Sequence, residues 1–326
     1  MSISRDEFLD RCGWAHARLD PVAGDASTRH YLRLTDPEGA RAILMCAPVD
    51  STADRAAFDA FRRIGGYLRH LDLSAPEEYA AASAEGFLLM EDLGDLSLSH
   101  LLETGAPEAE TAYRQAAHLL PILAKSAPAG LRAPDAEAMA AMVDLTFDML
   151  GADGVELPAL RGRLRVGLTD ALARHAGGAP VFALRDMHGD NLIWMPDREG
   201  SARVGLLDYQ DALRLPLGYD LASLLDDVRR DVPHAWRKDL VEDLSAQIDE
   251  TYEAATARID CLSLQRNLRI LGVFRRLSRQ FGKPAYADYL PRTRRLIARA
   301  VENPALARLH QPVSELLDRT AHWSAA

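Results

Sequence analysis

Three polar residues in the middle of the chain have types and spacing suited to phosphoryl transfer. Asp186 lies five positions before Asn191, and a second aspartate, Asp208, follows a mostly apolar stretch. Transfer of a phosphoryl group needs a base for the acceptor hydroxyl and oxygen ligands for a magnesium ion. Magnesium prefers hard oxygen ligands and usually takes only one or two of them from protein. An aspartate base with an asparagine and an aspartate as metal ligands meets both needs.

The sequence between the second and third of these residues predicts a β-hairpin. Two apolar runs, 192–195 and 204–207, flank a polar segment over 196–201 that begins with a proline, as expected for two strands and a turn. The ends of a hairpin lie about one strand spacing apart, roughly 4.8 Å. The hairpin would therefore return Asp208 to the side of Asn191.

Two other interpretations of the same acids remain open. Asp186, His188 and Asp190 alternate, so on an extended segment they could share one face and bind a metal ion for hydrolysis. Gly189 beside Asn191 instead indicates a tight loop, and no second histidine cluster lies nearby in the sequence. The acids could also be solvated turn residues. We favour phosphoryl transfer because the predicted hairpin adds a third group with the right chemistry.

The first 92 residues predict strands around one helix. Runs at 31–34 and 42–45 predict a hairpin, and an apolar run at 87–90 predicts a further strand. A helix capped by Ser51 or Thr52 is expected between them.

Two segments beside these strands are candidates for holding a nucleotide. The first hairpin is entered through a loop of small polar residues, whose backbone N–H groups could approach phosphate oxygens without obstruction. The last strand runs into a hinge whose backbone could bind an adenine edge. A surface turn and a strand that simply ends are the structural alternatives. The loop comprises Gly24, Asp25, Ala26, Ser27, Thr28 and Arg29, and the hinge comprises Met90, Glu91 and Leu93.

The chain after residue 95 is mostly helical in pattern. Apolar residues recurring at helical spacing predict a series of helices. In chain order they cover residues 113–123, 139–150, 160–172, 221–228, 239–257, 263–281 and 289–300.

The bulk composition is that of an ordinary globular protein. The chain has 326 residues, of which 48% are hydrophobic and 26% charged, enough for two lobes and a sizeable core. A net charge of −10 argues against nucleic acid or an anionic membrane surface as a partner. No apolar run approaches the length of a membrane span, and three widely spaced cysteines fit the reducing cytoplasm.

The order and spacing of these segments resemble the aminoglycoside phosphotransferase and choline kinase group of protein-kinase-like folds. The shared pattern is an aspartate, an asparagine five positions later, a hairpin and a second aspartate. Within the group, the chain most resembles the bacterial anomeric kinases of N-acetylmuramate and N-acetylglucosamine, which serve peptidoglycan recycling. The matching segments are 24–27, 45–48, 89–94, 185–191, 207–212 and 219–225.

The resemblance implies an α+β, protein-kinase-like fold of two lobes. A small β-rich lobe over residues 1–92 would bind the nucleotide. A larger, mainly helical lobe over residues 93–326 would carry the catalytic loop and the substrate pocket. ATP and Mg²⁺ are the implied cofactors.

The resemblance also implies a role for each residue of the central motif. Asp186 would be the catalytic base, and Asn191 and Asp208 would be the magnesium ligands. The 24–29 loop would lie over the triphosphate and the hinge would hold adenine. Three further residues are candidates for contact with the small-molecule acceptor: His188, Gln210 and Asp211.

The chain departs from kinase-like folds on the nucleotide side. These folds normally place a strand lysine, paired with a helix glutamate, on the α- and β-phosphates. Here the corresponding strand is apolar, the following helix has no glutamate, and no lysine precedes Lys125. An arginine would have to replace the lysine. Arg29 is the first candidate because it lies in the loop itself, and Arg33 and Arg41 are the others.

Other charged residues have structural interpretations. Asp220 begins an amphipathic helix, where the helix dipole would stabilise its charge. Arg275, Arg276 and Arg279 are expected to form a solvated basic face, with contact to an anionic group such as a lactyl carboxylate as the alternative.

The sequence thus favours an ATP- and magnesium-dependent kinase that phosphorylates a hydroxyl of a small molecule, above all the anomeric hydroxyl of an amino sugar. Aminoglycoside-type and choline-type acceptors remain open because a fold does not fix a function. The missing lysine and glutamate motivate a second hypothesis, a non-catalytic nucleotide-sensing protein on the same fold. A metal-dependent hydrolase is the third.

Overall fold

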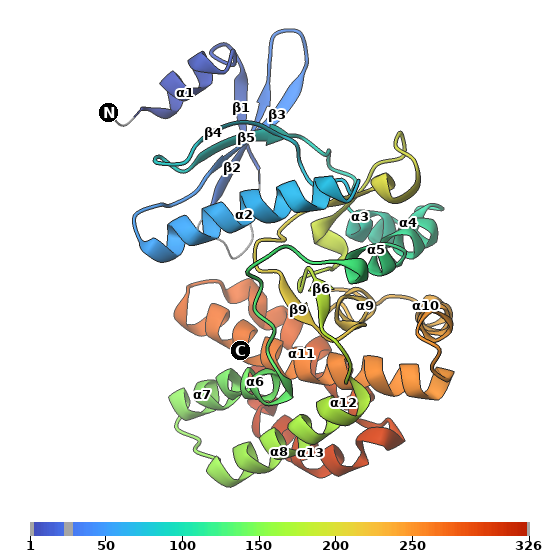
Figure 1. The fold of residues 1–326 in the computed structure, drawn as a ribbon. Helices are drawn as coiled ribbons and strands as arrows, with labels where there is room; N and C mark the ends of the chain where they lie inside the picture. The colour runs from blue at the N-terminus through green and yellow to red at the C-terminus, as the bar shows by residue number, and fades with distance from the viewer. Residues whose placement is uncertain (1–2, 23–28, 325–326) are drawn as a thin grey trace. The chain divides into compact units, whose positions relative to one another are not determined.

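The computed structural model describes residues 3–22 and 29–324, in a chain that divides into two compact units (Figure 1). Unit 1 is formed by Met1–Ala116 with Gly189–Ala212, and unit 2 by Ala117–His188 with Leu213–Ala326. The predicted lobe boundary between residues 92 and 93 stays a prediction. Unit 1 differs from the predicted first lobe because it also includes the hairpin that follows the central loop.

Unit 1 contains a five-stranded antiparallel sheet with the strand order β1-β2-β3-β5-β4. The strands are β1 (Arg18–Val22), β2 (His30–Thr35), β3 (Arg41–Cys46), β4 (Glu78–Ala82) and β5 (Phe87–Glu91). The sequence predicted β2, β3 and β5 but missed the two edge strands. Pro21 in β1 and the three alanines of β4 explain the omission, because proline and alanine are depleted in strands.

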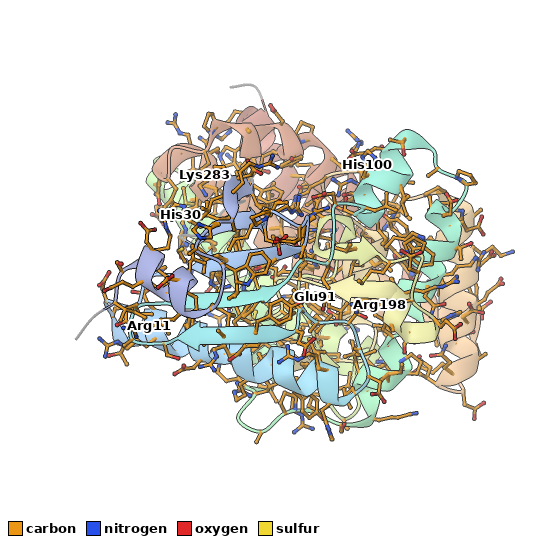
Figure 2. All side chains as sticks on the ribbon, turned by 90° about the horizontal axis from the view of Figure 1, so that it is seen from above. Arg11, His30, Glu91, His100, Arg198 and Lys283 are labelled. Carbon is orange, nitrogen blue, oxygen red and sulfur yellow. The ribbon has the colours of Figure 1, made fainter. Side chains whose placement is uncertain are left out.

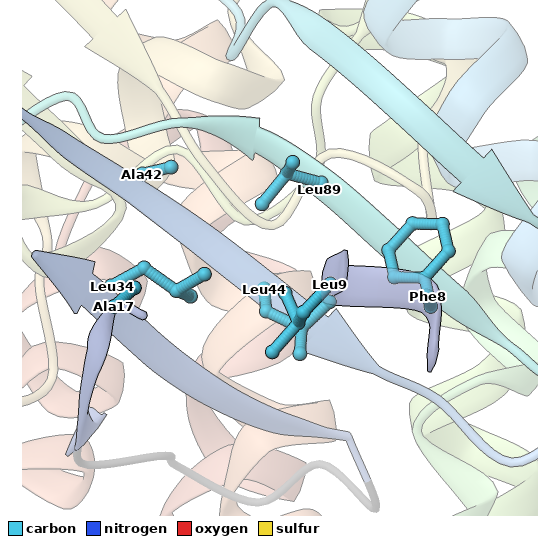
Figure 3. Close-up of a cluster of buried hydrophobic side chains, with 7 residues drawn as sticks. All are labelled: Phe8, Leu9, Ala17, Leu34, Ala42, Leu44 and Leu89. Carbon is cyan, nitrogen blue, oxygen red and sulfur yellow. The ribbon is translucent and has the colours of Figure 1, made fainter. Parts of the chain in front are cut away.

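The short helix α1 (Arg5–Arg11) packs against this sheet, although the sequence did not predict it. Ser4 caps the helix, and its side chain accepts a hydrogen bond from the Glu7 backbone N–H. The buried side chains that join α1 to the sheet form one apolar cluster (Figure 3). They are Phe8, Leu9, Ala17, Leu34, Ala42, Leu44 and Leu89.

The long helix α2 (Thr52–His70) runs along the sheet in Figure 1, and it confirms the predicted helix. Ser51 is its N-cap, as expected, and accepts a hydrogen bond from the Asp54 backbone N–H. The face that α2 buries includes Phe58, Phe61 and Gly65.

The remainder of unit 1 consists of short elements. They are α3 (Leu98–Thr104), α4 (Ala109–Ala117), which ends one residue beyond the unit, the 3-10 turns η1 (Gly189–Asn191) and η2 (Gly200–Arg203), and the strands β7 (Leu192–Trp194) and β8 (Val204–Leu206). The two strands pair antiparallel, with Leu192 opposite Leu206, which confirms the predicted hairpin.

Unit 2 is mainly helical and is organised around α11 (Tyr252–Gln280). This helix contacts α7, α8, α9, α10 and α12. The helices are α5 (Leu120–Lys125), α6 (Ala136–Ala141), α7 (Asp144–Ala152), α8 (Pro158–His175), α9 (Tyr219–Leu225), α10 (His234–Gln247), α12 (Leu290–Val301) and α13 (Ala307–Arg319). Short 3-10 turns are η3 (Pro284–Tyr289), η4 (Pro304–Leu306) and η5 (Ala321–Ser324), and β6 (Val181–Ala183) pairs antiparallel with β9 (Leu213–Leu215).

Several predicted helix ends are wrong. The predicted helix 113–123 is divided between α4 and α5, and 139–150 is divided between α6 and α7. The predicted break between 257 and 263 lies instead near Thr251, whose side chain accepts a hydrogen bond from the Ala254 backbone N–H. Apolar spacing reports which face of a helix is buried, whereas capping side chains determine where it begins.

The predicted fold class is confirmed, because an antiparallel sheet comes first in the chain and a mainly helical part follows. Among the described residues, no helix is long and apolar enough to cross a membrane.

Candidate active site

The segment before Asp186 is held from α9 by a buried carboxylate. Asp220, whose side chain is buried, accepts a hydrogen bond from the Leu184 N–H at 2.6 Å and another from the Arg185 N–H at 2.8 Å. We call residues 184–188 the clasped loop. Asp220 lies in the first turn of α9, at a helix start as expected, and its carboxylate has a further contact, because it also fixes the backbone just before the predicted base.

The backbone of the clasped loop is strained at Arg185. Its φ is +75°, in the left-handed region that costs a non-glycine residue roughly 1–3 kcal/mol. The two hydrogen bonds to Asp220 fix this conformation. Burial raises the pKa of the Asp220 carboxyl to about 7, although both N–H donors act to lower it. Strain that surrounding contacts maintain is typical of functional loops.

Asp186 keeps a partly open, ionised carboxylate at the end of this segment. Its side chain is 29% exposed, and Oδ1 lies 4.0 Å from Nη2 of Arg266, which is almost fully buried in α11. Burial acts to raise the pKa of Asp186, but the charges of Arg266, Arg185 and Arg269 outweigh it and hold that pKa below its usual value. The carboxylate can therefore accept a hydrogen bond from a hydroxyl across the neutral pH range.

His188 supports the clasped loop from within. Its backbone N–H donates to the Asp186 carbonyl oxygen at 3.1 Å, and its ring Nε2 lies 3.3 Å from Nη1 of Arg229. The Arg229 guanidinium lies over the rings of Phe274 and Tyr289, at 6.0 and 5.8 Å from their centroids. Burial and the Arg229 charge lower the pKa of His188 to about 4, so the imidazole is neutral at pH 7.

In unit 1, the two predicted magnesium ligands lie at the same end of the β7–β8 hairpin. The Leu207 N–H donates to the Asn191 carbonyl oxygen at 2.9 Å, which continues the strand pairing up to the residue before Asp208. Asp208 itself is exposed and has a φ of +54°. Gly189 is required just before Asn191, because a Cβ there would lie 3.0 Å from the Ser99 backbone nitrogen in α3.

The donor chemistry at this hairpin end suits magnesium. An amide oxygen from Asn191 and a carboxylate from Asp208 are hard ligands, and one or two protein ligands are usual for this ion. Nε2 of Gln210 donates to Oδ1 of Asp208 at 2.7 Å, so Gln210 orients a predicted metal ligand. Among the described residues, no group of three or more histidine, cysteine or acidic side chains could hold a metal. Asp211, the other predicted acceptor contact, is exposed.

The predicted triphosphate loop is described only at its last residue. Gly24, Asp25, Ala26, Ser27 and Thr28 lie outside the described residues. Arg29 is 9% exposed, and its guanidinium lies over the Phe61 ring of α2 at 5.6 Å from the centroid. Nη2 of Arg29 also donates to the Ala57 carbonyl oxygen at 3.4 Å, a long hydrogen bond.

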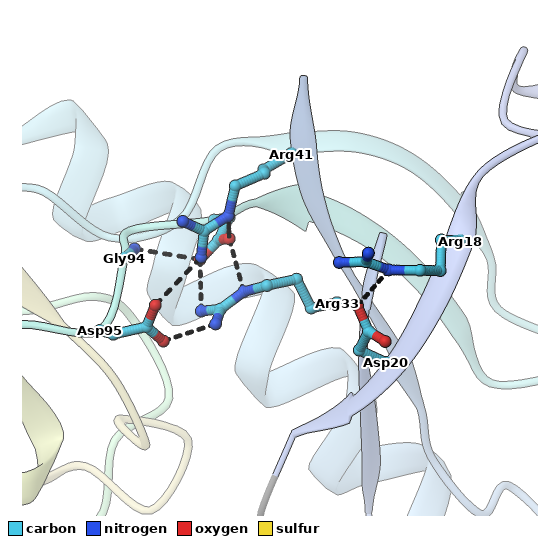
Figure 4. A network of polar contacts seen from close by, with 7 residues as sticks. Arg18, Asp20, Arg33, Arg41, Gly94 and Asp95 are labelled. Atoms are coloured by element: carbon cyan, nitrogen blue, oxygen red, sulfur yellow. Dashed lines mark hydrogen bonds and ion pairs between the residues drawn. The ribbon is translucent and has the colours of Figure 1, made fainter. Parts of the chain in front are cut away.

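The other two candidate arginines are bound to acids just after β5 (Figure 4). Arg33 and Arg41 place their Nε atoms 2.7 and 2.8 Å from the same oxygen of Asp92, which is buried. Both also pair with Asp95, at 2.5 and 3.2 Å. The ion pairs of Arg33 and Arg41 stabilise the chain segment that contains Asp92 and Asp95.

The predicted hinge residues occupy different environments. Met90 is buried in the sheet and Leu93 packs near Gly205 of β8, where a Cβ would approach it to 2.8 Å. Glu91 forms an ion pair with Arg198, and the two lie near each other in Figure 2. The adenine-binding role of this segment stays a prediction.

Two residues beside the site were missed as functional residues from sequence. Arg266 is a buried charge in α11, beside the buried polar residues Gln265 and Asn267, and its burial became evident only from the structure. Tyr209 follows Asp208 and is fully buried, which its sequence position did not reveal. The predicted solvated basic face is wrong at Arg275, which is buried, donates to Asp153 at 2.8 Å and lies over the Trp323 ring.

Comparisons with known proteins show the family of the chain. Residues 18–258 match the model of the phosphotransferase enzyme family. The N-acetylmuramate/N-acetylglucosamine kinase of Caulobacter vibrioides is 34% identical, and the alignment covers 93% of each chain. The enzyme of the same name from Pseudomonas aeruginosa is 29% identical, with 95% of each chain covered.

Solved structures give the same fold at low sequence identity. A choline/ethanolamine kinase family protein from Mesorhizobium loti matches with a TM-score of 0.62 at 17% identity, over 91% of this chain and 92% of that one. A thermostable mutant of the aminoglycoside phosphotransferase APH(4)-Ia, in a ternary complex with ADP and hygromycin B, matches with a TM-score of 0.59 at 14% identity, over 91% and 99% of the two chains.

The family match covers the five-stranded sheet, the clasped loop and the β7–β8 hairpin, whereas Arg266 lies just beyond it. Together with the relatives that align over nearly their full length, it identifies an ATP-dependent phosphotransferase of small molecules. The chain belongs to the phosphotransferase enzyme family.

Proposed function

We propose that this protein uses ATP and magnesium to phosphorylate the anomeric hydroxyl of an amino sugar, N-acetylmuramate or N-acetylglucosamine. The observation that carries the proposal is the clasped loop, in which Asp220 fixes the backbone and Arg266 keeps Asp186 ionised. The choice of acceptor is supported by the 34% identity to the Caulobacter vibrioides kinase.

In the proposed reaction, Asp186 orients the acceptor hydroxyl and takes its proton. The hydroxyl oxygen forms a bond to the γ-phosphorus of ATP, and the bond from that phosphorus to the β–γ bridging oxygen breaks. The electron pair leaves with ADP, and the proton passes to the Asp186 carboxylate.

The lowered pKa of Asp186 keeps its carboxylate ionised, so it can accept the proton of an acceptor hydroxyl near neutral pH. The anomeric hydroxyl is the most acidic hydroxyl of a sugar, because its carbon also carries the ring oxygen, and it is therefore the easiest sugar hydroxyl for a carboxylate to deprotonate.

Asn191 and Asp208 are the proposed ligands of magnesium, and Gln210 is proposed to orient Asp208. When bound, the ion would supply positive charge that offsets the negative charge developing on the transferred phosphoryl group. Catalysis would then consist mainly of positioning and charge neutralisation. We propose Arg29 as the phosphate-side cation, and residues 24–28 and the hinge 90–94 as the parts that hold the rest of ATP.

The acceptor side is rich in arginine near Asp186. Arg266 and Arg229 both lower the pKa of His188, so the surroundings of the clasped loop carry positive charge. This charge favours a neutral or anionic acceptor over polycationic aminoglycosides or cationic choline. We keep the cytoplasm as the proposed location, in line with three free cysteines at positions 12, 46 and 261.

The test is an acceptor panel with the purified chain. ADP release is measured with ATP, magnesium and either N-acetylmuramate, N-acetylglucosamine, choline or an aminoglycoside. We expect turnover with at least one amino sugar and loss of that turnover in Asp186→Asn and Asp208→Asn. Asp170→Asn is the matched control, because Asp170 is exposed on α8 and has no proposed role in the site.

Three outcomes would count against the proposal. Turnover by Asp186→Asn and Asp208→Asn at the level of Asp170→Asn would overturn the assigned roles. Turnover with choline or an aminoglycoside alone would overturn the acceptor. Stabilisation by ATP and magnesium without turnover on any acceptor would favour a nucleotide sensor.

A further inference from the structure

Tyr209 fills the interior of unit 1 directly after the proposed metal ligand Asp208. Its side chain is 1% exposed, and its ring stacks on Phe61 of α2 with a centroid distance of 4.8 Å and an interplanar angle of 23°. Burial raises the pKa of the Tyr209 hydroxyl, so the phenol stays neutral. The residue that follows Asp208 is thus anchored in the packing of α2.

Gly65 of α2 is required by this tyrosine. A Cβ at Gly65 would lie 2.5 Å from the Tyr209 hydroxyl oxygen, closer than real contacts allow, and 3.1 Å from Cζ, which is a tight contact. The next residue, Gly66, has no such neighbour, since a Cβ there would meet only the end of the Arg69 side chain at 3.8 Å. Two adjacent glycines of one helix therefore differ sharply in what surrounds them.

Phe61 also contacts Arg29. The Arg29 guanidinium lies 5.6 Å from the Phe61 ring centroid, and Tyr209 stacks on the same ring. Cations are attracted to the faces of aromatic rings, and stacked rings pack rigidly when buried. We call Arg29, Phe61 and Tyr209 the aromatic stack.

Tyr31 of β2 is a neighbour of both charged groups. Burial raises the pKa of the Tyr31 hydroxyl, while Arg29 acts to lower that pKa and the charge of Asp208 acts to raise it. Arg29 and Asp208 therefore share a neighbour in addition to the stack.

We propose that the aromatic stack couples Arg29, as the cation on the nucleotide's phosphates, to Asp208, as the magnesium ligand. This inference rests on the proposed ATP-dependent function. Tyr209 and Phe61 are positioning residues: Tyr209 fixes the backbone of Asp208, and Phe61 fixes the plane of the Arg29 guanidinium. α2 contains no glutamate between Thr52 and His70 that could form an ion pair with a phosphate-binding cation. In this proposal, α2 positions the cation through ring packing instead.

The chemistry of arginine explains why ring packing matters for the role proposed for Arg29. A guanidinium is planar and binds phosphate through a fork of N–H groups, so its plane must be oriented. A ring face beside the guanidinium restricts that plane without using its N–H groups.

The test compares Gly65→Ala with Gly66→Ala. Both substitutions add one methyl group to α2 and raise its helix propensity equally, but only Gly65→Ala displaces Tyr209. Calorimetry measures the Kd of ATP with and without magnesium, and turnover gives the KM of ATP and of the acceptor. We expect Gly65→Ala to weaken ATP–magnesium binding at least fivefold, to leave the acceptor KM unchanged, and to differ from Gly66→Ala, which binds like the wild type.

Tyr209→Phe tests whether Gly65→Ala acts through its clash with the Tyr209 hydroxyl. Removing the hydroxyl leaves Cζ, 3.1 Å from the added Cβ, as the nearest atom, so a small shift accommodates it. Gly65→Ala/Tyr209→Phe is therefore expected to recover most of the ATP affinity that Gly65→Ala loses. In a double-mutant cycle, Arg29→Met and Phe61→Leu should each weaken ATP binding at least threefold. The double variant should bind ATP no more weakly than the more affected single variant.

Two results would overturn the coupling. One is a folded Gly65→Ala variant with the ATP–magnesium Kd of Gly66→Ala. The other is strict additivity of Arg29→Met and Phe61→Leu. Failure of the proposed amino-sugar activity is distinguishable, because it appears as absent turnover in a wild type whose ATP binding still responds to these substitutions. A wild type that binds no ATP would contradict both proposals.

Discussion

The clasped loop of unit 2 and the aromatic stack of unit 1 hold their charged groups by different physical means. In the clasped loop, Asp220 binds backbone N–H groups, and Arg266 acts on Asp186 through its charge. In the aromatic stack, Arg29 is held by the face of Phe61 and by the packing of Tyr209. The contacts that hold Asp186 and the backbone before it are polar, whereas the Arg29 guanidinium and the Tyr209 ring both pack on the Phe61 ring.

This difference determines how each region tolerates change. Hydrogen bonds to a buried carboxylate are specific, so one lost partner leaves a buried polar group unsatisfied. Ring packing depends on volume and shape, so different residues of the right size can maintain it. We therefore expect substitutions in the clasped loop to act mainly on kcat and those in the aromatic stack to act mainly on nucleotide affinity.

The largest expected effect is on the proposed base. Asp186→Asn removes the carboxylate that accepts the hydroxyl proton, and it should lower kcat about 10³-fold, equivalent to ~4 kcal/mol. The KM of ATP should stay within about threefold, since the amide keeps the shape of the side chain. Steady-state kinetics with an amino sugar provide the measurement, beside Asp170→Asn. A kcat near that of the control would remove Asp186 from the chemistry.

The next effect is on stability in acid. His188 has a pKa of about 4 in the folded protein and 6.5 ordinarily, so the unfolded chain binds a proton first as the pH falls. The free energy of unfolding should therefore decrease between pH 6.5 and pH 4, with His188 contributing up to about 3 kcal/mol. Urea titrations of the wild type and His188→Gln test this.

The variant should lose that part of the pH dependence, whereas His310→Gln, at an exposed position of α13, should keep it. Identical pH dependence in His188→Gln and the wild type would mean that His188 titrates near its ordinary pKa.

A smaller effect on kcat is expected from changing Asp220, which holds the clasped loop. Asp220→Asn keeps one oxygen acceptor but turns an NH₂ group towards a backbone N–H, which leaves a buried donor unsatisfied at a cost of about 1–3 kcal/mol. We expect kcat to fall roughly tenfold to a hundredfold, with little change in the KM of ATP. An unchanged kcat together with reduced thermal stability would assign Asp220 a purely structural role.

The smallest effect concerns the arginines outside the aromatic stack. Arg41→Gln should change the KM of ATP by less than about threefold, because Arg33 still pairs with both Asp92 and Asp95 in the variant. Arg29→Met should raise it more than about tenfold, since charge-assisted hydrogen bonds to phosphate are strong. If Arg41→Gln raised the KM of ATP more than Arg29→Met, the phosphate contact would be assigned to Arg41 instead of Arg29.

The contrast between the two regions also explains what could be predicted from the sequence. Asp186, Asn191 and Asp208 lie within one short stretch, and the hairpin that joins the last two is a local pattern of apolar runs. Local patterns of this kind can be recognised in a single sequence. The fold class followed from the resemblance that the same motif carries.

The contacts that hold these groups depend on residues far apart in the chain. Asp220 meets residues 184 and 185, Arg266 meets Asp186, and Tyr209 meets Phe61 and Gly65. No spacing rule links such pairs, because tertiary packing brings them together. The edge strands and several helix ends were missed for a related reason: they depend on pairing and capping more than on apolar periodicity.

The position of the transferred phosphate tests the central claim most directly. The protein is incubated with ATP, magnesium and N-acetylglucosamine or its 1-deoxy analogue, and ³¹P NMR with ¹H coupling identifies the phosphorylated carbon. We predict a phosphate on C1 of N-acetylglucosamine and no product from the analogue, which lacks the anomeric hydroxyl. A phosphate on another carbon, or equal phosphorylation of the analogue, would contradict the account.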